Sequence, residues 1–372
     1  MTLILTINGA EYTAWKSVSV DRSLGNGART FRVAAANIPN PVWPIDDAPT
    51  CEIHLNNILV LRGSIEDDQA QIDEATHGRQ LSGRSLTGDV IDSSVNLPGN
   101  EIKGRTLDEI IRQAAAPHGV SVTIDGDPGA PFDAVRPFQG ETVFSLADRL
   151  ARHRGFLPTA TAEGNLHLFR ASLAAGGHKL IEGQNIKGLR RTRKMAQRFS
   201  EYVVRGQKPG TEQAYGRNAS VEAVLRDPGV PRYRRLAIVM EEPGDIQAAR
   251  DRADWEAARR AADSLTAGGR VVGWERAPGV LWEPGDVVQL VSPSLQVNRT
   301  MLVDAVKSTL DDSSGEVTDL TFAVPESATP EAATSVRQTG AVSGATGASP
   351  AAADGFTVSD IWTTAKPAGR AQ

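Results

Sequence analysis

The sequence contains one cysteine and six histidines, and this shortage excludes several kinds of site. The single Cys51 cannot form an internal disulfide, which is typical of a protein that folds in a reducing cytosol. It lies in the strand-like run CEIHL, so we interpret it as an apolar strand residue. The histidines are scattered singly, without the spacing that metal ligands need. We therefore expect neither a metal site nor a cofactor.

Long hydrophobic runs and a strong excess of one charge are also absent. No apolar stretch approaches the ~18 residues that a membrane-spanning helix needs. The start, MTLILTING, lacks the basic residues and the small-residue cleavage site of a signal peptide, so it reads as a β-strand. A net charge of −5 does not indicate a nucleic-acid-binding protein. The length of 372 residues is enough for two or three domains.

Strand patterns separated by turns fill residues 1–95. Apolar and polar residues alternate in LILTI, WKSVSV and TFRVAA, and the pairs Asn8–Gly9 and Asn56–Asn57 are typical of tight hairpins. Short strands joined in this way favour a small β-barrel or β-sandwich. We predict a first β-domain over 1–95.

Helical spacing appears in the next region, residues 96–177. The segments TLDEIIRQAAAPHG and GETVFSLADRLARHRG predict two helices, SVTIDG a strand and FLPTATAEGNLHLFR a hairpin. Thr106 is placed to cap the first helix, and Pro117 to end it. We predict a small α+β module.

Strand patterns return over 178–325, interrupted by one alanine-rich helix predicted at 245–267 and ended by Gly268–Gly269. The fold class is therefore α+β, mostly β, with two antiparallel β-domains and an intervening module. Residues 326–372 form a low-complexity tail that cannot bury enough apolar surface to fold alone. Its segment 356–362 carries Phe356, Ile361 and Trp362, so it is either a docking segment for a partner or a disordered end with chance hydrophobics.

The stretch LSGRSLTGDVIDSS, Leu81 to Ser94, has the serines, carboxylates and glycines of catalytic loops. It does not fit a nucleophile elbow, because the serine comes one residue early and no strand–elbow–helix pattern surrounds it. It does not fit a phosphate-binding loop either, because Asp89 stands where the lysine belongs. We predict no catalytic residue and no enzyme here.

A basic segment, GLRRTRKMAQR, is the remaining candidate site. It could bind nucleic acid, but it has little aromatic interleaving and the chain is acidic overall. We favour a solvated strand face or an interface with a protein neighbour. The residues concerned are Arg190, Arg191, Arg193 and Arg198.

The helix in GETVFSLADRLARHRG resembles the opening of a LysM peptidoglycan-binding module. The chain then continues into a hairpin, whereas a LysM module continues into a second helix. Peptidoglycan binding or hydrolysis is therefore the alternative function.

The order of motifs along the chain resembles the baseplate hub proteins of Mu-like contractile phage tails. The motifs are WKSVSVDRSL, TFRVAA, VWPI, CEIHLNNILVLRGSIED, LSGRSLTGDVIDSS, DRADWEAARRAADSL, LWEPGDVVQL and TDLTFAVP. The fifth of them matches the pattern G-R-[DS]-x-T-x-D-[LV]-[IV]-D-x-S, with Ser85 where aspartate is more common. The resemblance covers about residues 3–325 and does not reach the tail.

This resemblance implies a structural protein of the virion tail baseplate, assembled in the cytoplasm of the host bacterium. It implies a homotrimer in which two tube-like β-domains per chain make a ring of six similar units. Such a ring joins the sixfold tail tube to the threefold membrane-puncturing spike and contacts other baseplate proteins and the tape measure. DNA crosses its channel without specific binding. An infectious phage and a tailocin-like particle both remain possible sources.

One structural expectation concerns the junction after the first β-domain. Arg84 is expected to pair with Asp89 or Asp92 and to fix this corner, because charge-assisted hydrogen bonds hold such turns.

Overall fold

The computed structural model describes residues 2–13, 15–36, 49–72, 77–97, 99, 101–171, 177–208, 220–240 and 244–328. The predicted docking residues Phe356, Ile361 and Trp362 lie outside these ranges, as does the low-complexity tail from 329 onward. The chain divides into two compact units, one built from Met1–Arg191 with Thr266–Pro330 and one built on Thr192–Leu265. The predicted domain 178–325 contributes to both units, and the division at residues 95, 177 and 325 remains a proposal.

The first β-region is a sandwich formed by one bent sheet, not a closed barrel. Its core lies between a layer of β1, β5 and the first half of β6 and a layer of β3, β4 and β7. The long strand β6 belongs to both layers, because its first half pairs with β5 and its second half with β7. The strands are β1 (Leu3–Ile7), β2 (Ala10–Tyr12), β3 (Ser17–Ser23), β4 (Thr30–Ala36), β5 (Thr50–Leu55), β6 (Ile58–Ile72) and β7 (His77–Ser85).

Two glycines allow the backbones of β6 and β7 to approach closely at this bend. A Cβ on Gly63 would lie 1.9 Å from the carbonyl oxygen of Arg84, and one on Gly83 would lie 2.0 Å from that of Ser64. Gly83 lies inside β7, where its role is close backbone packing.

We expect Gly83→Ala to lower the free energy of unfolding by about 2–3 kcal/mol, because the added methyl group would collide with backbone that cannot rotate away. Urea denaturation followed by circular dichroism measures the change. Gly78→Ala is the matched control in the same strand, since its Cβ would have no atom within 4 Å. Equal stability of the two variants would contradict the close approach.

Cys51 lies in the sandwich core, 2 % exposed, as expected for an apolar strand residue. Burial raises the pKa of its thiol to about 12, so the reactive thiolate is scarce at neutral pH. We expect the native protein to resist iodoacetamide at pH 8 and to be alkylated at one site once unfolded. Mass spectrometry detects the adduct, and rapid labelling of the folded protein would contradict this assignment.

The second β-region repeats the first. The strands β5, β6 and β7 contain 6, 15 and 9 residues, and β19, β20 and β21 contain the same numbers. Both 15-residue strands carry an irregularity near their middle, at Ile65/Asp67 in β6 and at Val303/Ala305 in β20. The strands of this region are β11 (His178–Ile181), β12 (Gly188–Arg193), β16 (Leu265–Val272), β17 (Glu275–Ala277), β18 (Val280–Leu281), β19 (Val287–Ser292), β20 (Val297–Asp311) and β21 (Gly315–Ala323), followed by the 3-10 turn η5 (Pro325–Ala328).

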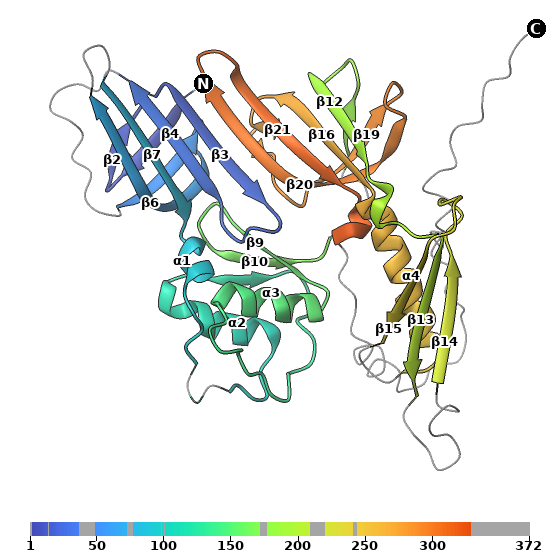
Figure 1. The fold of residues 1–372 in the computed structure, drawn as a ribbon. Helices are drawn as coiled ribbons and strands as arrows, with labels where there is room; N and C mark the ends of the chain where they lie inside the picture. Colours follow the sequence, from blue (N-terminus) through green and yellow to red (C-terminus); the bar gives the residue numbers. More distant parts are fainter. Residues whose placement is uncertain are drawn as a thin grey trace, which may run out of the picture. The chain divides into compact units, whose positions relative to one another are not determined.

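The two repeats join edge to edge, so that they share one 13-stranded sheet (Figure 1). Strand β20 pairs antiparallel with β3 over seven residues, from Ala305↔Ser23 to Asp311↔Ser17. The path of the sheet is β12-β16-β21-β20-β3-β4-β7-β6-β5-β1-β2. The expected mostly-β fold is confirmed, and the continuous sheet is an addition that the local patterns did not predict.

The α+β module lies between the two repeats in the sequence. Two amphipathic helices and a small sheet, ordered β8-β10-β9, enclose its own hydrophobic core. Thr106 caps the first helix through a capping box with Glu109, as its sequence predicted. The elements are α1 (Thr87–Asp92), α2 (Leu107–Ala115), η2 (Ala116–His118), β8 (Val122–Ile124), α3 (Val143–His153), β9 (Leu157–Ala160) and β10 (Leu166–Phe169).

The second compact unit consists of a three-stranded sheet covered by helix α4 (Ile246–Asp263). Four alanines at helical spacing, Ala249, Ala253, Ala257 and Ala261, are buried, which lets the helix approach β13 and β14 closely. The other elements are η3 (Met195–Gln197), β13 (Glu201–Gln207), β14 (Ser220–Arg226) and β15 (Arg235–Val239).

The prediction of a helix over 245–267 was wrong at the C-terminal end. The helix ends at Asp263, where the Ser264 hydroxyl donates to the Ala261 carbonyl. Gly268–Gly269 lie inside β16 and do not cap the helix. The ring of Phe322 explains the second glycine, because a Cβ on Gly269 would lie 3.0 Å from it.

Candidate functional site

The candidate site is the polar face of the continuous sheet. One row of residues crosses six strands in register, from β16 to β7. The order of the row is Arg270, Asp319, Lys307, Asp21, Thr30 and Arg84. Because neighbouring residues of a strand point to opposite faces, the residues next to this row are buried and mostly apolar. Two such rows flank the polar row, and they contain the buried apolar residues Leu320 and Val306 on one side and Val271, Val20 and Phe31 on the other.

Every charged side chain of this polar row contacts an opposite charge. Arg270 donates two hydrogen bonds to Asp319, at 2.7 and 2.8 Å. The Lys307 Nζ lies 3.4 Å from an Asp21 oxygen, and this pair bridges the two repeats. The third cation of the row, Arg84, contacts Glu66. The next row carries Ser19, Arg32, Ser82 and Asp67, which gives one cation and one anion. The cations of the polar row are therefore compensated by neighbouring carboxylates.

A buried ionic cluster joins the two repeats beneath the sheet. Glu283 accepts from the Arg22 Nη1 at 3.2 Å and from the Arg29 Nη1 and Nη2 at 3.1 and 3.0 Å. The side chains of Arg22 and Arg29 are 1 % and 7 % exposed, and burial lowers the pKa of Arg22 although Glu283 opposes this shift. Arg22 also donates to the Ser308 hydroxyl at 2.5 Å. The cluster holds β3 of the first repeat against β20 of the second.

The same cluster reaches the α+β module. Arg29 donates from Nε to the Ala160 carbonyl at 3.1 Å and from Nη1 to the Val60 carbonyl at 2.9 Å. The backbone N–H of Arg62 donates to the Ala162 carbonyl at 2.7 Å. One guanidinium thus contacts the first repeat, the second repeat and the module, so Arg29 is the central residue of this junction.

The predicted corner residue Arg84 contacts Asp92, as the sequence suggested. Its Nη1 donates to Asp92 at 3.2 Å, and its Nε donates to Glu66 at 2.8 Å. The hydrogen bonds from Arg84 lower the pKa of the Asp92 carboxyl. Asp89 lies exposed in the first turn of α1, on the helix that follows β7 directly. The junction role of Arg84, Asp89 and Asp92 remains a proposal.

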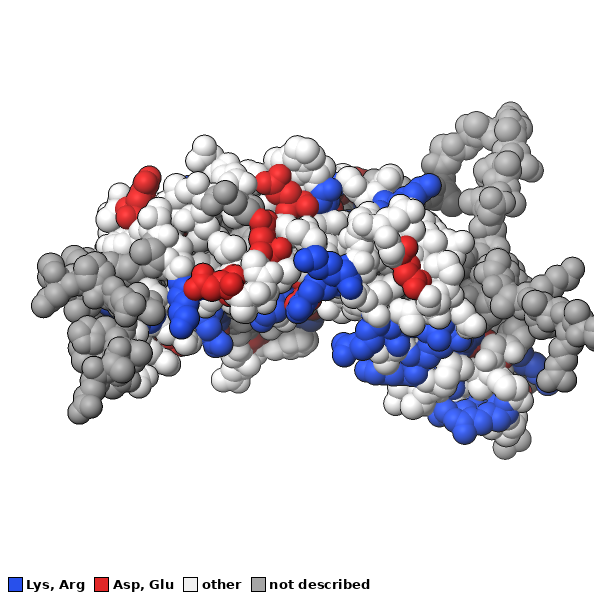
Figure 2. Space-filling model, turned by 90° about the horizontal axis from the view of Figure 1, so that it is seen from above, with Lys and Arg blue, Asp and Glu red and all other residues white. Residues whose placement is uncertain are grey.

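The basic segment divides into two different environments. Arg190 and Arg193 are exposed on the strand β12, and Arg191 is half-buried. Arg198 is fully buried and donates to Asp227 at 2.5 and 2.9 Å, so its inclusion in an exposed patch is corrected. Figure 2 shows that lysine and arginine side chains gather in groups on the face drawn there, some of them beside acidic side chains. An interface role for Arg190, Arg191 and Arg193 remains a prediction.

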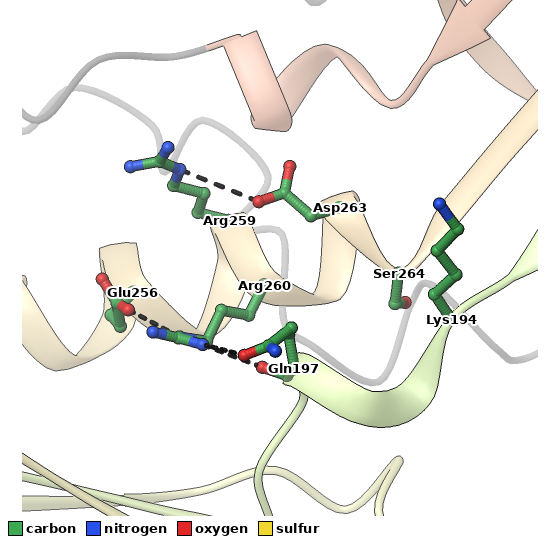
Figure 3. Close-up of a pocket in the computed structure, with 7 residues that line it drawn as sticks. All are labelled: Lys194, Gln197, Glu256, Arg259, Arg260, Asp263 and Ser264. Atoms are coloured by element: carbon green, nitrogen blue, oxygen red, sulfur yellow. Dashed lines mark hydrogen bonds and ion pairs between the residues drawn. The ribbon is translucent and has the colours of Figure 1, made fainter.

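A polar pocket lies at the C-terminal end of α4 in the second unit (Figure 3). Arg260 donates to Glu256 at 2.6 Å and to the Gln197 carbonyl at 3.1 Å, and Arg259 lies 3.8 Å from Asp263. Desolvation raises the pKa of Asp263. These charges pair with one another within the pocket, which is typical of a structural network.

Two further observations limit the chemistry of the described residues. They contain no group of three or more His, Cys, Asp or Glu side chains that could hold a metal ion. In the same part of the chain, no helix is long and apolar enough to cross a membrane.

Comparisons with known proteins agree with this architecture. Four family models match consecutive parts of the chain. They describe the Mu phage baseplate assembly protein GpP-like N-terminal domain (residues 2–85), the baseplate hub protein gp44-like second domain (87–170), the tail protein NMB1110-like third domain (198–255) and the Mu phage baseplate assembly protein GpP fourth domain (245–331). The chain is 31% identical to baseplate hub protein gp44 of Escherichia phage Mu over 87% of its own length and 88% of that protein. The chain belongs to the Mu-type baseplate hub family.

Solved structures share the fold of this hub protein. The 43 kDa tail protein of prophage MuSo2 from Shewanella oneidensis matches with a TM-score of 0.77 and 28% identity, over 89% of this chain and 99% of that one. The tail protein from Neisseria meningitidis MC58 matches with a TM-score of 0.72 and 20% identity, over 88% and 98%. The Escherichia coli c3393 protein, a component of the type VI secretion system, shows the same fold at 9% identity with a TM-score of 0.56, over 86% and 76%.

Sequence reasoning missed the junction residues Arg22, Arg29 and Glu283. One signal was present for the first of them. Arg22 follows Val18 and Val20 at strand spacing, so it falls on the buried face of β3, where an arginine needs a partner. Nothing local marks Glu283 as that partner, because 261 positions separate the two residues.

Proposed function

We propose that this baseplate hub protein forms a homotrimeric ring that joins the sixfold tail tube to the threefold spike. The internal repeat carries the proposal. Each chain contains two copies of one β-unit. Three chains therefore present six similar β-units to the sixfold tube and three identical chains to the threefold spike. A heterologous interface that closes after a fixed rotation generates such a ring.

The polar sheet face supports a role as channel wall. DNA is retained by walls with uncompensated lysine or arginine, since these bind phosphates in a salt-dependent way. In the central row of this face, Arg270 and Lys307 each contact an aspartate. The proposed wall therefore presents hydrogen-bonding groups to water without a phosphate-binding surface, and DNA passes through it without specific binding.

The remaining parts of the proposal concern partners and chemistry. The ring contacts the spike protein, the tube protein, other baseplate proteins and the tape measure, and it is assembled in the host bacterial cytoplasm. The segment 356–362 docks on one of these partners. The protein acts without catalysis and without a cofactor, in agreement with the structural role of the gp44-like family to which it belongs.

Native mass spectrometry of the purified protein tests this function. The expected species has three times the chain mass of 39.6 kDa. A monomer at all concentrations, combined with retention on purified peptidoglycan, would favour the alternative cell-wall function.

The channel-wall assignment makes a separate prediction. We expect the variant Asp21→Lys/Asp319→Lys to bind short duplex DNA at least about tenfold more tightly than the wild type at low salt, because it frees Lys307 and Arg270 and adds cations. Fluorescence anisotropy at several salt concentrations measures this. The control is Asp125→Lys/Asp148→Lys in the α+β module, which changes the net charge equally. Equal DNA binding by both variants would contradict the assignment.

A further inference from the structure

The continuous sheet has two open edges of complementary charge. At one end, β12 pairs with β16 alone among the described strands, and it carries the sequence GLRRTR. In the first repeat, β6 pairs with β5 only as far as Ser64, and beyond Ile65 its described partner is β7 alone. Six consecutive residues there, Glu66 to Gln71, are exposed. On the side away from β7, the backbone N–H and C=O groups of this half have no partner among the described strands, so they can pair with a further strand.

The internal repeat shows what should cover the open half of β6. In the second repeat, the part of β20 that follows its bulge corresponds to the open half of β6. Strand β3 pairs with the edge of this part of β20. The strand equivalent to β3 in the second repeat is β12. The backbone supports this equivalence, because Lys16 donates to the Ala34 carbonyl at 2.9 Å and Lys187 donates to the Arg270 carbonyl at 2.8 Å at matching positions of the two repeats.

We propose that β12 of one copy pairs antiparallel with residues 67–72 of β6 in the next copy, as β3 pairs with β20 within each chain. The inference rests on the proposed ring, because it names the strands that close it. The register of this pairing follows from superposing the first repeat on the second. In β3 and β12, Ser23 then corresponds to Lys194 and Ser19 to Arg190. In β20 and β6, Ala305 corresponds to Asp67 and Thr309 to Gln71.

This register places opposite charges across the interface. Lys194 of one copy faces Asp67 of the next, and Arg193 faces Asp68, whose carboxylate Arg79 of its own chain also contacts. Within the chain, the β3–β20 junction carries the ion pair Lys307–Asp21 at a neighbouring position of the same register, so both junctions would use cross-strand ion pairs. A register shift of one residue would turn every side chain of β12 to the other face of the sheet. The pairing would also extend the polar face of the sheet from one chain to the next.

Cysteine cross-linking tests the register in the intact trimer. In a Cys51→Ala background, Arg190→Cys/Gln71→Cys places two thiols directly opposite each other across the proposed interface, within reach of a disulfide or a short dithiol linker. We expect covalent dimers and trimers on a denaturing gel. The positive control is Ser19→Cys/Thr309→Cys, whose residues face each other within one chain and should link without a change in chain number. The register control is Arg190→Cys/Ala70→Cys, with the thiols on opposite faces.

Charge reversal gives a second measurement that does not depend on cysteine. Asp67→Lys is expected to raise the concentration at which half of the trimer dissociates about tenfold, because the introduced ammonium group would face Lys194. Adding Lys194→Asp in the same chain should restore assembly, since each chain supplies both strands.

The outcomes separate the pairing from the ring itself. Interchain linking at Arg190/Gln71, weaker linking in the register control and rescue by Lys194→Asp support the pairing. A stable trimer without this linking, or with linking only in the register control, overturns the pairing and leaves the proposed ring intact. A wild-type monomer at all concentrations overturns both.

Discussion

Replacing Asp227 by alanine is expected to lower the free energy of unfolding of the unit Thr192–Leu265 by about 3–5 kcal/mol. The side chains of Arg198 and Asp227 are both 0 % exposed, and two hydrogen bonds of 2.5 and 2.9 Å join them. The Asp227 carboxylate also accepts from the Gly229 N–H at 2.8 Å. Its removal would leave the guanidinium charge buried and without its carboxylate, which costs far more than the pair itself contributes.

Hydrogen exchange monitored by mass spectrometry measures this loss within the unit. Faster exchange should appear in β13, β14 and α4, while the sandwich of the first repeat stays protected. The matched control is Glu222→Ala, which breaks an ion pair with Arg205 whose side chains are 48 % and 56 % exposed; it should cost less than about 1 kcal/mol. The double variant Arg198→Leu/Asp227→Leu removes both charges and should recover much of the lost stability. An effect of Asp227→Ala as small as that of Glu222→Ala would contradict the buried pair.

The elements of both repeats could be predicted from the sequence because each depends on local chemistry. Alternation in TFRVAA placed Phe31 and Val33 on one face of β4, where both are buried. The module was predicted for the same reason, since its helices carry their own caps and apolar faces. Local patterns predict an element wherever one of its faces contacts water and the other contacts a hydrophobic core.

The joining of the repeats could not be predicted, because it depends on contacts between distant residues. Lys307 and Asp21 are 286 positions apart, and neither shows a local sign of pairing. The 6-15-9 repeat of strand lengths was also hidden, since the loops between the strands differ in length and the residues differ in type. The sequence therefore predicted two β-domains but not the single sheet that they share.

The candidate site shows the same limit. Arg84 and Asp92 were found because eight positions separate them around one corner. Arg198 was misplaced because a run of basic residues predicts an exposed strand, whereas the 3-10 turn at Met195–Gln197 turns the chain and buries this arginine against Asp227. Gly269 was interpreted as part of a helix cap, because glycine marks helix ends and turns as well as close packing.

Glu283→Gln tests whether the buried cluster holds the two repeats together. The variant keeps the size of the side chain but removes the charge that Arg22 and Arg29 share. We expect a loss of about 3 kcal/mol in the free energy of unfolding, at the lower end for buried pairs because the Glu283 side chain is 34 % exposed. Arg29 retains its bonds to the Ala160 and Val60 carbonyls and Arg22 its bond to Ser308. The introduced amide oxygen can still accept a hydrogen bond, but it carries no negative charge to offset the two guanidinium groups.

Tryptophan fluorescence during urea denaturation reports on this junction, because the buried Trp282 directly precedes Glu283. The backbone N–H of Trp282 donates to the backbone carbonyl of Trp274, which is also buried. The control is Asp319→Asn, which breaks the exposed pair with Arg270 on the polar face of the same sheet and should leave the stability nearly unchanged. If the cluster joins the repeats, Glu283→Gln should also speed proteolysis between them, whereas Asp319→Asn should not. A stability loss equal to that of Asp319→Asn would mean that the β3–β20 hydrogen bonds hold the repeats without help from the cluster.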